Sequence, residues 1–261
     1  MVIFLLVNIK MNSNEVFPVK KEDKKDEFPY LDHTFPTPSF LMNIVAPKSS
    51  GKSVLANSII YNFYYKSFHP DKCDNLIVYI SPNLGGSDPN LRFIEKDESI
   101  IKISENLGDG GLDQIIETII EDQDKIDPED RPYLLLILDD CLPFFGSNFT
   151  TLAKLGSYNR HKRISLIVIS QSFRKIPQIL RYNADSWVLF RTYNEQEVDK
   201  FLEEFGGAFP DFLTHYKNSC NKKYNFLYVD TKRQKLYHNF TKLLWSREDQ
   251  SNIPEPTKKG I

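Results

Sequence analysis

One segment limits the possible folds of this chain more than any other: Ala-Pro-Lys-Ser-Ser-Gly-Lys-Ser at residues 46–53. It lies between an apolar run at 40–45, which predicts a short strand, and an amphipathic run at 54–65, which predicts a helix. Strand, loop and helix together match the phosphate-binding pattern G-x-x-x-x-G-K-[ST], with Ala46 in place of the first glycine. The segment therefore predicts a βα unit that binds the phosphates of a nucleoside triphosphate.

The loop predicts a role for each of its side chains. Lys52 is expected to reach the β- and γ-phosphates, and the Ser53 hydroxyl to ligate Mg²⁺. Gly51 can adopt backbone conformations that are closed to other residues. The predicted nucleotide-binding residues are Pro47, Lys48, Ser49, Ser50, Gly51, Lys52, Ser53 and Val54. The alternative is a turn rich in Ser and Lys that only begins a helix.

A second motif follows later in the chain, where the apolar run at 134–138 ends in Asp139 and Asp140. An apolar strand followed by an acidic pair is the Walker B pattern. It predicts that Asp139 holds Mg²⁺ beside Ser53, and that Asp140 orients and deprotonates the attacking water. By itself the pattern is weak, because many strands end in Asp.

The next predicted strand, at 164–169, runs into Ser170 and Gln171. If it lies between the two motif strands, as in additional-strand P-loop ATPases, Gln171 faces the γ-phosphate and senses it or positions water. A glutamine that merely caps a turn is the alternative. Arg160, in the basic run 160–163, could reach the nucleotide of a neighbouring subunit and neutralise transition-state charge. Arg174 and Arg181 compete for that role, and all three could instead bind DNA or face solvent.

Strands and helices alternate along the middle of the chain, which predicts an α/β fold. We expect a three-layer P-loop NTPase of the additional-strand type, with a central, mostly parallel β-sheet flanked by helices. Residues 224–229 are expected to close the sheet as an antiparallel edge strand. The predicted organisation is a flexible charged arm at 1–35, an ATPase domain at 36–245 and a tail at 246–261.

Composition narrows the function classes. The 261 residues carry a net charge of −2, with 41% apolar and 26% charged residues, which is ordinary for a globular protein. Residues 141–242 hold 16 Lys and Arg against 8 Asp and Glu, a local excess of positive charge that suits a polyanion such as nucleic acid.

Three scattered cysteines argue against a disulfide framework. The apolar start at 2–7 is too short to span a bilayer, so no stable membrane insertion is expected; residues 1–10 are either an upstream extension or an edge strand.

Taken together, these motifs resemble the FtsK–HerA superfamily, and most closely the genome-packaging ATPases of large double-stranded DNA viruses and virophages. The resemblance covers roughly residues 40–242. Its most specific part is the unit that begins at Arg160 and ends at Gln171, eleven residues later. Two departures are Ala46 in the P-loop, where family members vary, and Asp140, where many members carry Glu.

The resemblance implies an ATP-driven translocase of double-stranded DNA that packages a viral genome into a capsid. ATP and Mg²⁺ would be bound at subunit interfaces of a homo-oligomeric, usually hexameric, ring. A capsid or portal-vertex protein would be a further partner. The implied location is intracellular, in the host cytoplasm or viral factory, or associated with the virion.

Two other functions stay open from the sequence. A small-molecule or nucleotide kinase shares the P-loop and the sheet, although it usually needs an arginine-rich lid and has no use for Gln171. A P-loop assembly protein that does not hydrolyse nucleotide is supported only by Ala46. A superfamily 2 helicase is disfavoured, because the chain has no room for a second recombinase-like domain.

Overall fold

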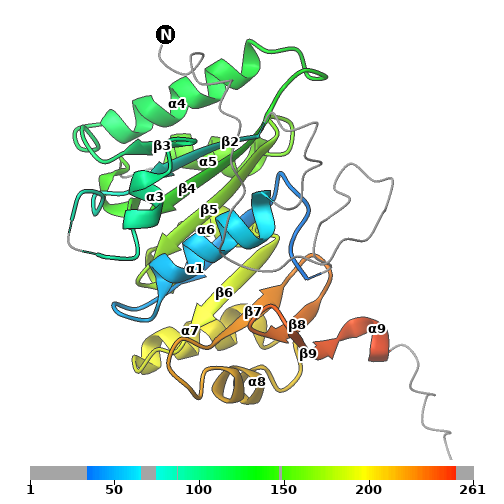
Figure 1. Ribbon diagram of the computed structural model, residues 1–261. Helices are drawn as coiled ribbons and strands as arrows, with labels where there is room; N and C mark the ends of the chain where they lie inside the picture. Colours follow the sequence, from blue (N-terminus) through cyan, green and yellow to red (C-terminus); the bar gives the residue numbers. More distant parts are fainter. Residues whose placement is uncertain (1–33, 66–74, 87, 147–148, 251–261) are drawn as a thin grey trace, which may run out of the picture.

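The computed structural model describes residues 34–65, 75–86, 88–146 and 149–250. In these residues a single nine-stranded sheet carries helices on both faces (Figure 1). The order across the sheet is β3-β2-β4-β5-β1-β6-β7-β8-β9. The strands are β1 (Leu41–Val45), β2 (Asn75–Ile80), β3 (Ile100–Ile103), β4 (Tyr133–Asp139), β5 (Ile164–Ser170), β6 (Ser186–Phe190), β7 (Phe226–Asp230), β8 (Lys235–His238) and β9 (Lys242–Ser246).

The helices lie mainly between consecutive parallel strands. The α-helices are α1 (Lys52–Ser58), α3 (Arg92–Lys96), α4 (Gly111–Asp124), α5 (Thr150–Tyr158), α6 (Gln178–Tyr182), α7 (Glu195–Phe205), α8 (Phe212–Ser219) and α9 (Arg247–Gln250). Short 3-10 helices, η3 (Leu142–Phe144) and η4 (Phe173–Lys175), follow β4 and β5. The strands from β3 to β6 in the sheet order pair in parallel, and β7, β8 and β9 are added antiparallel. The expected α/β class with a mostly parallel sheet is confirmed.

The apolar side chains of the central strands alternate between two cores, as the two-residue repeat of a strand requires. In β4, Leu134, Leu136 and Leu138 face one core, while Leu135 and Ile137 face the other. The first core also contains buried side chains of α4, α5, α7 and α8, and the second contains those of α1. Both faces of the parallel strands are therefore covered, which makes the fold a three-layer sandwich.

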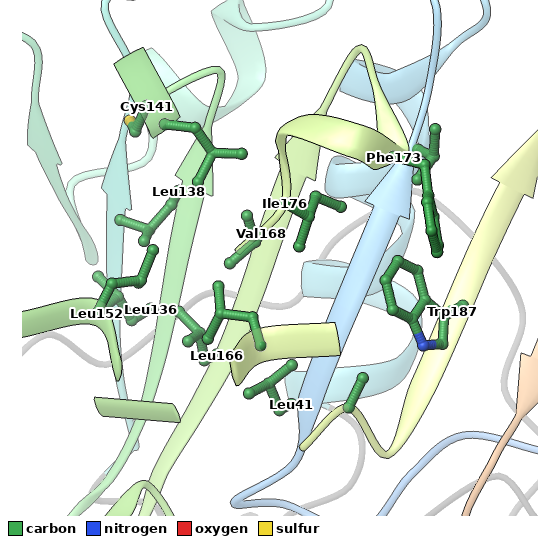
Figure 2. Packing of buried hydrophobic residues seen from close by; sticks show 14 of the residues in the cluster. Leu41, Leu136, Leu138, Cys141, Leu152, Leu166, Val168, Phe173, Ile176 and Trp187 are labelled. Carbon is green, nitrogen blue, oxygen red and sulfur yellow. The ribbon is translucent and has the colours of Figure 1, made fainter. Parts of the chain in front are cut away.

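Aromatic contacts secure the sheet next to the β5 end (Figure 2). Phe173 packs on Trp187 of β6 with ring centroids 4.9 Å apart, and edge-on against Phe201 of α7 at 5.3 Å. Both Phe173 and Trp187 are almost completely buried. The turn that follows β5 is therefore fixed to β6 and α7, which holds the end of β5 in place.

Three features differ from the sequence expectations. The helix predicted at 54–65 is α1 followed directly by a π-helix, η2 (Ile59–Tyr64). The antiparallel strand expected at the sheet edge is present as β7, but the edge position was wrong, because β8 and β9 extend the sheet beyond it. The sequence analysis did not predict β8 and β9. Both strands are short and contain lysine, so apolar and polar residues alternate only weakly in them, and they are stabilised by pairing with neighbouring strands.

The ends of the chain are described only in part. Of the expected arm at 1–35, Thr34 and Phe35 are described, and Phe35 is buried against Phe40 at 5.3 Å between ring centroids. The first ten residues and most of the expected tail lie outside the described residues; residues 246–250 end β9 and form α9. No helix in the described part of the chain combines the length and apolar character needed to cross a membrane.

Candidate nucleotide-binding site

The loop at 46–53 joins the end of β1 to the start of α1. Two of its residues have left-handed backbone conformations, Ser49 at φ 64° and Gly51 at φ 99°. The N–H of Ser50 donates to the carbonyl of Pro47 at 3.2 Å, which closes the turn. The φ of Gly51 lies where a side chain is strained, so the glycine of the Gly-Lys-Ser triplet is required by the backbone.

The backbone conformation at position 46 does not require glycine. Ala46 is not among the described residues with positive φ, it is fully buried, and its methyl group belongs to the core that contains α1. Its N–H donates to the carbonyl of Ser170 at 2.9 Å, which extends the pairing of β1 with β5. The departure from the motif at Ala46 is therefore compatible with a loop of this shape.

We expect Ala46→Gly to lower the free energy of unfolding by about 1–2 kcal/mol, because it adds backbone freedom to the unfolded chain and removes a buried methyl group. Urea denaturation of the wild type and the variant measures this difference. An equal or higher stability of the glycine variant would show that Ala46 is strained.

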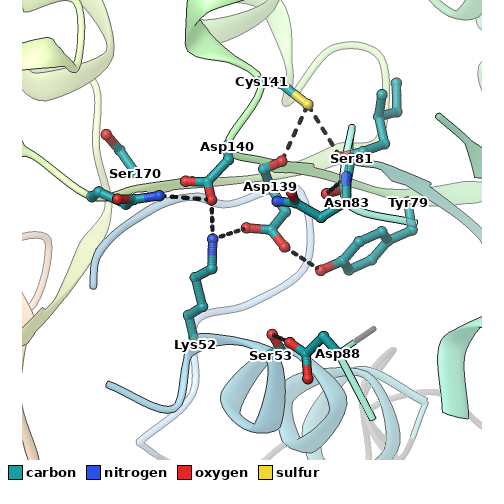
Figure 3. Close-up of polar contacts among 12 residues, drawn as sticks. Lys52, Ser53, Tyr79, Ser81, Asn83, Asp88, Asp139, Asp140, Cys141 and Ser170 are labelled. Atoms are coloured by element: carbon teal, nitrogen blue, oxygen red, sulfur yellow. Dashed lines mark hydrogen bonds and ion pairs between the residues drawn. The ribbon is translucent and has the colours of Figure 1, made fainter. Parts of the chain in front are cut away.

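Lys52 meets both carboxylates of the acidic pair at the end of β4 (Figure 3). Its Nζ lies 3.1 Å from Oδ1 of Asp139 and forms an ion pair with Asp140. Burial opposes the charge on Lys52, but Asp139 and Asp140 outweigh it and raise the pKa of the ammonium. Lys52 is therefore charged at neutral pH and is bound to the groups predicted to act on metal and water.

Asp139 is the buried member of the pair, with 1% of its surface exposed. The Tyr79 hydroxyl of β2 donates to its Oδ2 at 2.9 Å. Burial raises the pKa of Asp139, and the Lys52 ammonium counteracts this only in part. Among the described residues Oδ1 accepts no well-aligned hydrogen bond. Oδ1 nevertheless faces a cation already, the Lys52 ammonium at 3.1 Å. A buried carboxylate oxygen in that position is the kind of ligand that Mg²⁺ prefers.

Asp140 and Gln171 meet because β5 lies between β1 and β4, as the prediction for Gln171 required. Nε2 of Gln171 donates to Oδ2 of Asp140 at 3.1 Å, and the N–H of Asp140 donates to the Ile169 carbonyl at 3.1 Å. Asp140 has φ 57°, a left-handed conformation that Asp and Asn adopt more readily than Glu. The backbone conformation at this position therefore favours Asp over Glu, the residue that many members of the resembling superfamily carry here.

Ser53, the predicted metal ligand, is bound by a residue that the sequence analysis missed. Its Oγ donates to Oδ2 of Asp88 at 2.7 Å, and the Asp88 carboxylate also accepts from the N–H of Asn90 at 2.9 Å. Partial burial tends to raise the pKa of Asp88, but hydrogen bonds from Asn90 and Ser53 outweigh it and lower the pKa. Asp88 lies in a polar turn between β2 and α3, and nothing local in its sequence marks it. Tyr79 was missed as well, because it reaches Asp139 through the pairing of β2 with β4, which the sequence does not reveal.

The structure does not bring Arg160 to this site. Arg160 precedes β5 at the opposite edge of the sheet, where its guanidinium pairs with Oδ1 of Asp185 at 2.5 Å and is 58% exposed. Arg174 follows β5 at the carboxyl edge and donates to Gln196 at 2.8 Å. Arg181 pairs with Glu204 at 2.9 Å.

The described residues contain no group of three or more His, Cys, Asp and Glu side chains that could hold a metal by themselves. Ser53 and Asp139 remain the two side chains predicted to ligate a metal here. Mg²⁺ usually keeps waters and phosphate oxygens among its ligands and needs few ligands from a protein.

The fold is that of P-loop NTPases, and it matches solved structures of that class. The genome packaging NTPase B204 from Sulfolobus turreted icosahedral virus 2, solved in complex with ATP-gammaS, superposes with a TM-score of 0.58 at 18% identity; the match covers 78% of this chain and 98% of B204. EssC (ATPases 2 and 3) from Geobacillus thermodenitrificans matches at 0.51 and 11% identity, over 74% of this chain and 38% of EssC. At these identities the likeness is one of fold.

A relative is also found by sequence. Uncharacterized protein 075L of Invertebrate iridescent virus 6 is 30% identical over 111 residues, which are 40% of this chain and 42% of the relative. The match thus spans less than half of the viral protein. No family model matches the chain.

Proposed function

We propose that this chain is an ATPase that drives double-stranded DNA into a viral capsid. The observation that carries the proposal is the convergence of Lys52, Asp139, Asp140 and Gln171 at the carboxyl edge of β1, β4 and β5. A P-loop lysine, a metal-binding carboxylate, a base and a polar sensor are the parts that hydrolysis of a triphosphate requires.

The ion pair of Lys52 suggests how substrate binding activates the site. The phosphates of ATP compete for the Lys52 ammonium, which then leaves Asp140 and binds the β- and γ-phosphates. Asp140 is freed to accept a proton at Oδ2 from the attacking water, which the Gln171 amide holds in line. Ser53, which donates to Asp88, and Oδ1 of Asp139, which faces Lys52, are the groups that would hold Mg²⁺. Mg²⁺, when bound there, neutralises charge that develops on the phosphate oxygens.

We assign the remaining site residues the roles that the sequence predicts for them. The loop from Pro47 to Val54 binds the phosphates. Arg160 lies far from the site of its own chain and pairs with Asp185, so a role in hydrolysis would require the nucleotide of a neighbouring copy in a ring. Such a ring, hexameric in the resembling family, would be built from the ATPase domain at 36–245, with the flexible charged arm at 1–35 and the tail at 246–261 outside that domain.

Two observations support DNA as the partner: the excess of Lys and Arg over Asp and Glu in residues 141–242, and the likeness to a genome packaging NTPase. A capsid or portal-vertex protein is the second partner that packaging requires. The work would take place inside the infected cell, where genomes and capsids meet.

ATP turnover by the full chain, with and without linear duplex DNA, tests the proposal. We expect DNA to raise the rate of phosphate release, and added salt to reverse the increase, because DNA contacts are screened by ions. Heparin of equal charge is the control for a non-specific polyanion. A rate of phosphate release that is the same with and without DNA would contradict a DNA motor. Transfer of phosphate to a nucleoside would contradict it as well and would favour the kinase alternative.

A further inference from the structure

An exposed tyrosine lies against the glycine of the P-loop. A Cβ placed on Gly51 would lie 2.9 Å from Cδ1 of Tyr224, so the ring occupies the space that the missing side chain leaves. The Tyr224 side chain is nevertheless 58% exposed. Nζ of Lys223 lies 4.7 Å from the centroid of its ring. The loop before β7 therefore presents an aromatic surface beside the phosphate-binding loop.

The backbone of this loop is held in an uncommon conformation. Tyr224 has φ 70°, which is unfavourable for a bulky side chain. The next residues are fixed, since the N–H of Asn225 donates to the Lys222 carbonyl at 3.3 Å and that of Phe226 to Oδ1 of Asn239 at 3.0 Å. Backbone strain of this kind persists where the surroundings enforce it, and it is concentrated at functional sites.

The sheet order places Tyr224 on the flank of the P-loop that faces away from the catalytic groups. Asp139, Asp140 and Gln171 belong to β4 and β5, on one side of β1, whereas β6 and β7 lie on the other side. Because β7 is antiparallel, its first residue, Phe226, pairs with the last residue of β6, Phe190, at the carboxyl edge. A triphosphate whose γ end points to Asp140 and Gln171 must direct its nucleoside end away from them, toward β6 and β7.

We propose that Tyr224 is the platform for the base of the nucleotide, which stacks on its ring while the Lys223 ammonium borders the same ring. This inference rests on the proposed function, because it takes the position of the phosphates from it. Stacking uses the π-face that every base has and reads no hydrogen-bonding edge. The site would thus bind a nucleoside triphosphate by the ring of its base as well as by its phosphates.

The test compares the affinity of the full chain for a non-hydrolysable ATP analogue with its affinity for inorganic tripolyphosphate, by titration calorimetry with Mg²⁺. We expect Tyr224→Ala to raise the Kd of the analogue by about fivefold to a hundredfold, the range of one base–aromatic stack. The Kd of tripolyphosphate, which has no base, should stay unchanged. Tyr224→Phe keeps the ring and should retain the affinity of the wild type for both ligands.

Tyr158→Ala is the matched control, because Tyr158 is exposed to the same degree, 57%, but ends α5 at the opposite edge of the sheet. It should bind both ligands like the wild type. If Tyr224→Ala binds the analogue normally while Lys52→Ala loses both ligands, the base platform is wrong and the proposed function stands. Equal losses for both ligands in Tyr224→Ala would show that the ring only shapes the P-loop. A wild type that binds neither ligand would overturn the proposed function, and the platform with it.

Discussion

Lys52→Ala is expected to reduce ATP turnover by at least about 10²–10³-fold, the loss seen when one preorganised charge-stabilising donor is removed. Lys52 is the ammonium that contacts both Asp139 and Asp140, and in the proposed mechanism it moves from them to the phosphates. Phosphate release under saturating ATP measures the effect. Lys125→Ala is the matched control, because Lys125 also pairs with a carboxylate, Asp122, but lies after α4, far from the site.

The same variant should reveal the electrostatic role of Lys52 through its stability. Without the ammonium, the pKa of buried Asp139, already raised by burial, rises further. An acid whose pKa is higher in the folded state destabilises the fold above that pKa and has no such effect below its unfolded value. Lys52→Ala should therefore be less stable than the wild type at neutral pH, with a difference that shrinks as the pH falls through the folded pKa of Asp139. A variant that hydrolyses ATP at the rate of the wild type would contradict the role of Lys52.

Asp140→Asn is expected to lower turnover by about 10²–10⁴-fold, because it removes the general base while nearly conserving shape. The left-handed backbone at φ 57° tolerates Asn, and Gln171 Nε2 can still donate to the amide oxygen. Affinity for ATP should be equal or higher, since Lys52 loses a competing carboxylate. Measuring phosphate release together with the Kd of ATP separates the two effects.

Asp211→Asn provides a matched control for this substitution. Asp211 has nearly the same backbone conformation, φ 53°, and is exposed at the start of α8. It should turn over ATP at the rate of the wild type. Turnover by Asp140→Asn within a few-fold of the wild type would mean that another group accepts the proton.

The parts of the molecule that the sequence predicts well are those with strong local patterns. The P-loop, the apolar strand before Asp139 and the strand before Gln171 each carry their own signal, and their order in a parallel sheet brings their ends together. The sequence places Gln171 near the acidic pair only under the condition that β5 lies between β1 and β4, and that order is observed. Its hydrogen bond to Asp140 was not predicted.

The parts that escaped prediction depend on contacts between distant segments. Asp88 reaches Ser53 from a turn 35 residues away, and Tyr79 reaches Asp139 over 60 residues. Tyr224 meets Gly51 only because β7 turns back beside β6. Ala46 looked like a defect in the motif, but its position in the core accounts for the methyl group. None of these contacts leaves a local pattern in the chain.

The most direct test of the central claim is a single-turnover measurement of ATP cleavage by the full chain with Mg²⁺ and linear duplex DNA. The account predicts that the wild type converts ATP to ADP and inorganic phosphate, that Asp140→Asn binds ATP without cleaving it, and that Lys52→Ala does neither. Absence of phosphate release by the wild type, with ATP bound and unchanged, would contradict it and identify a P-loop protein that binds nucleotide without hydrolysis.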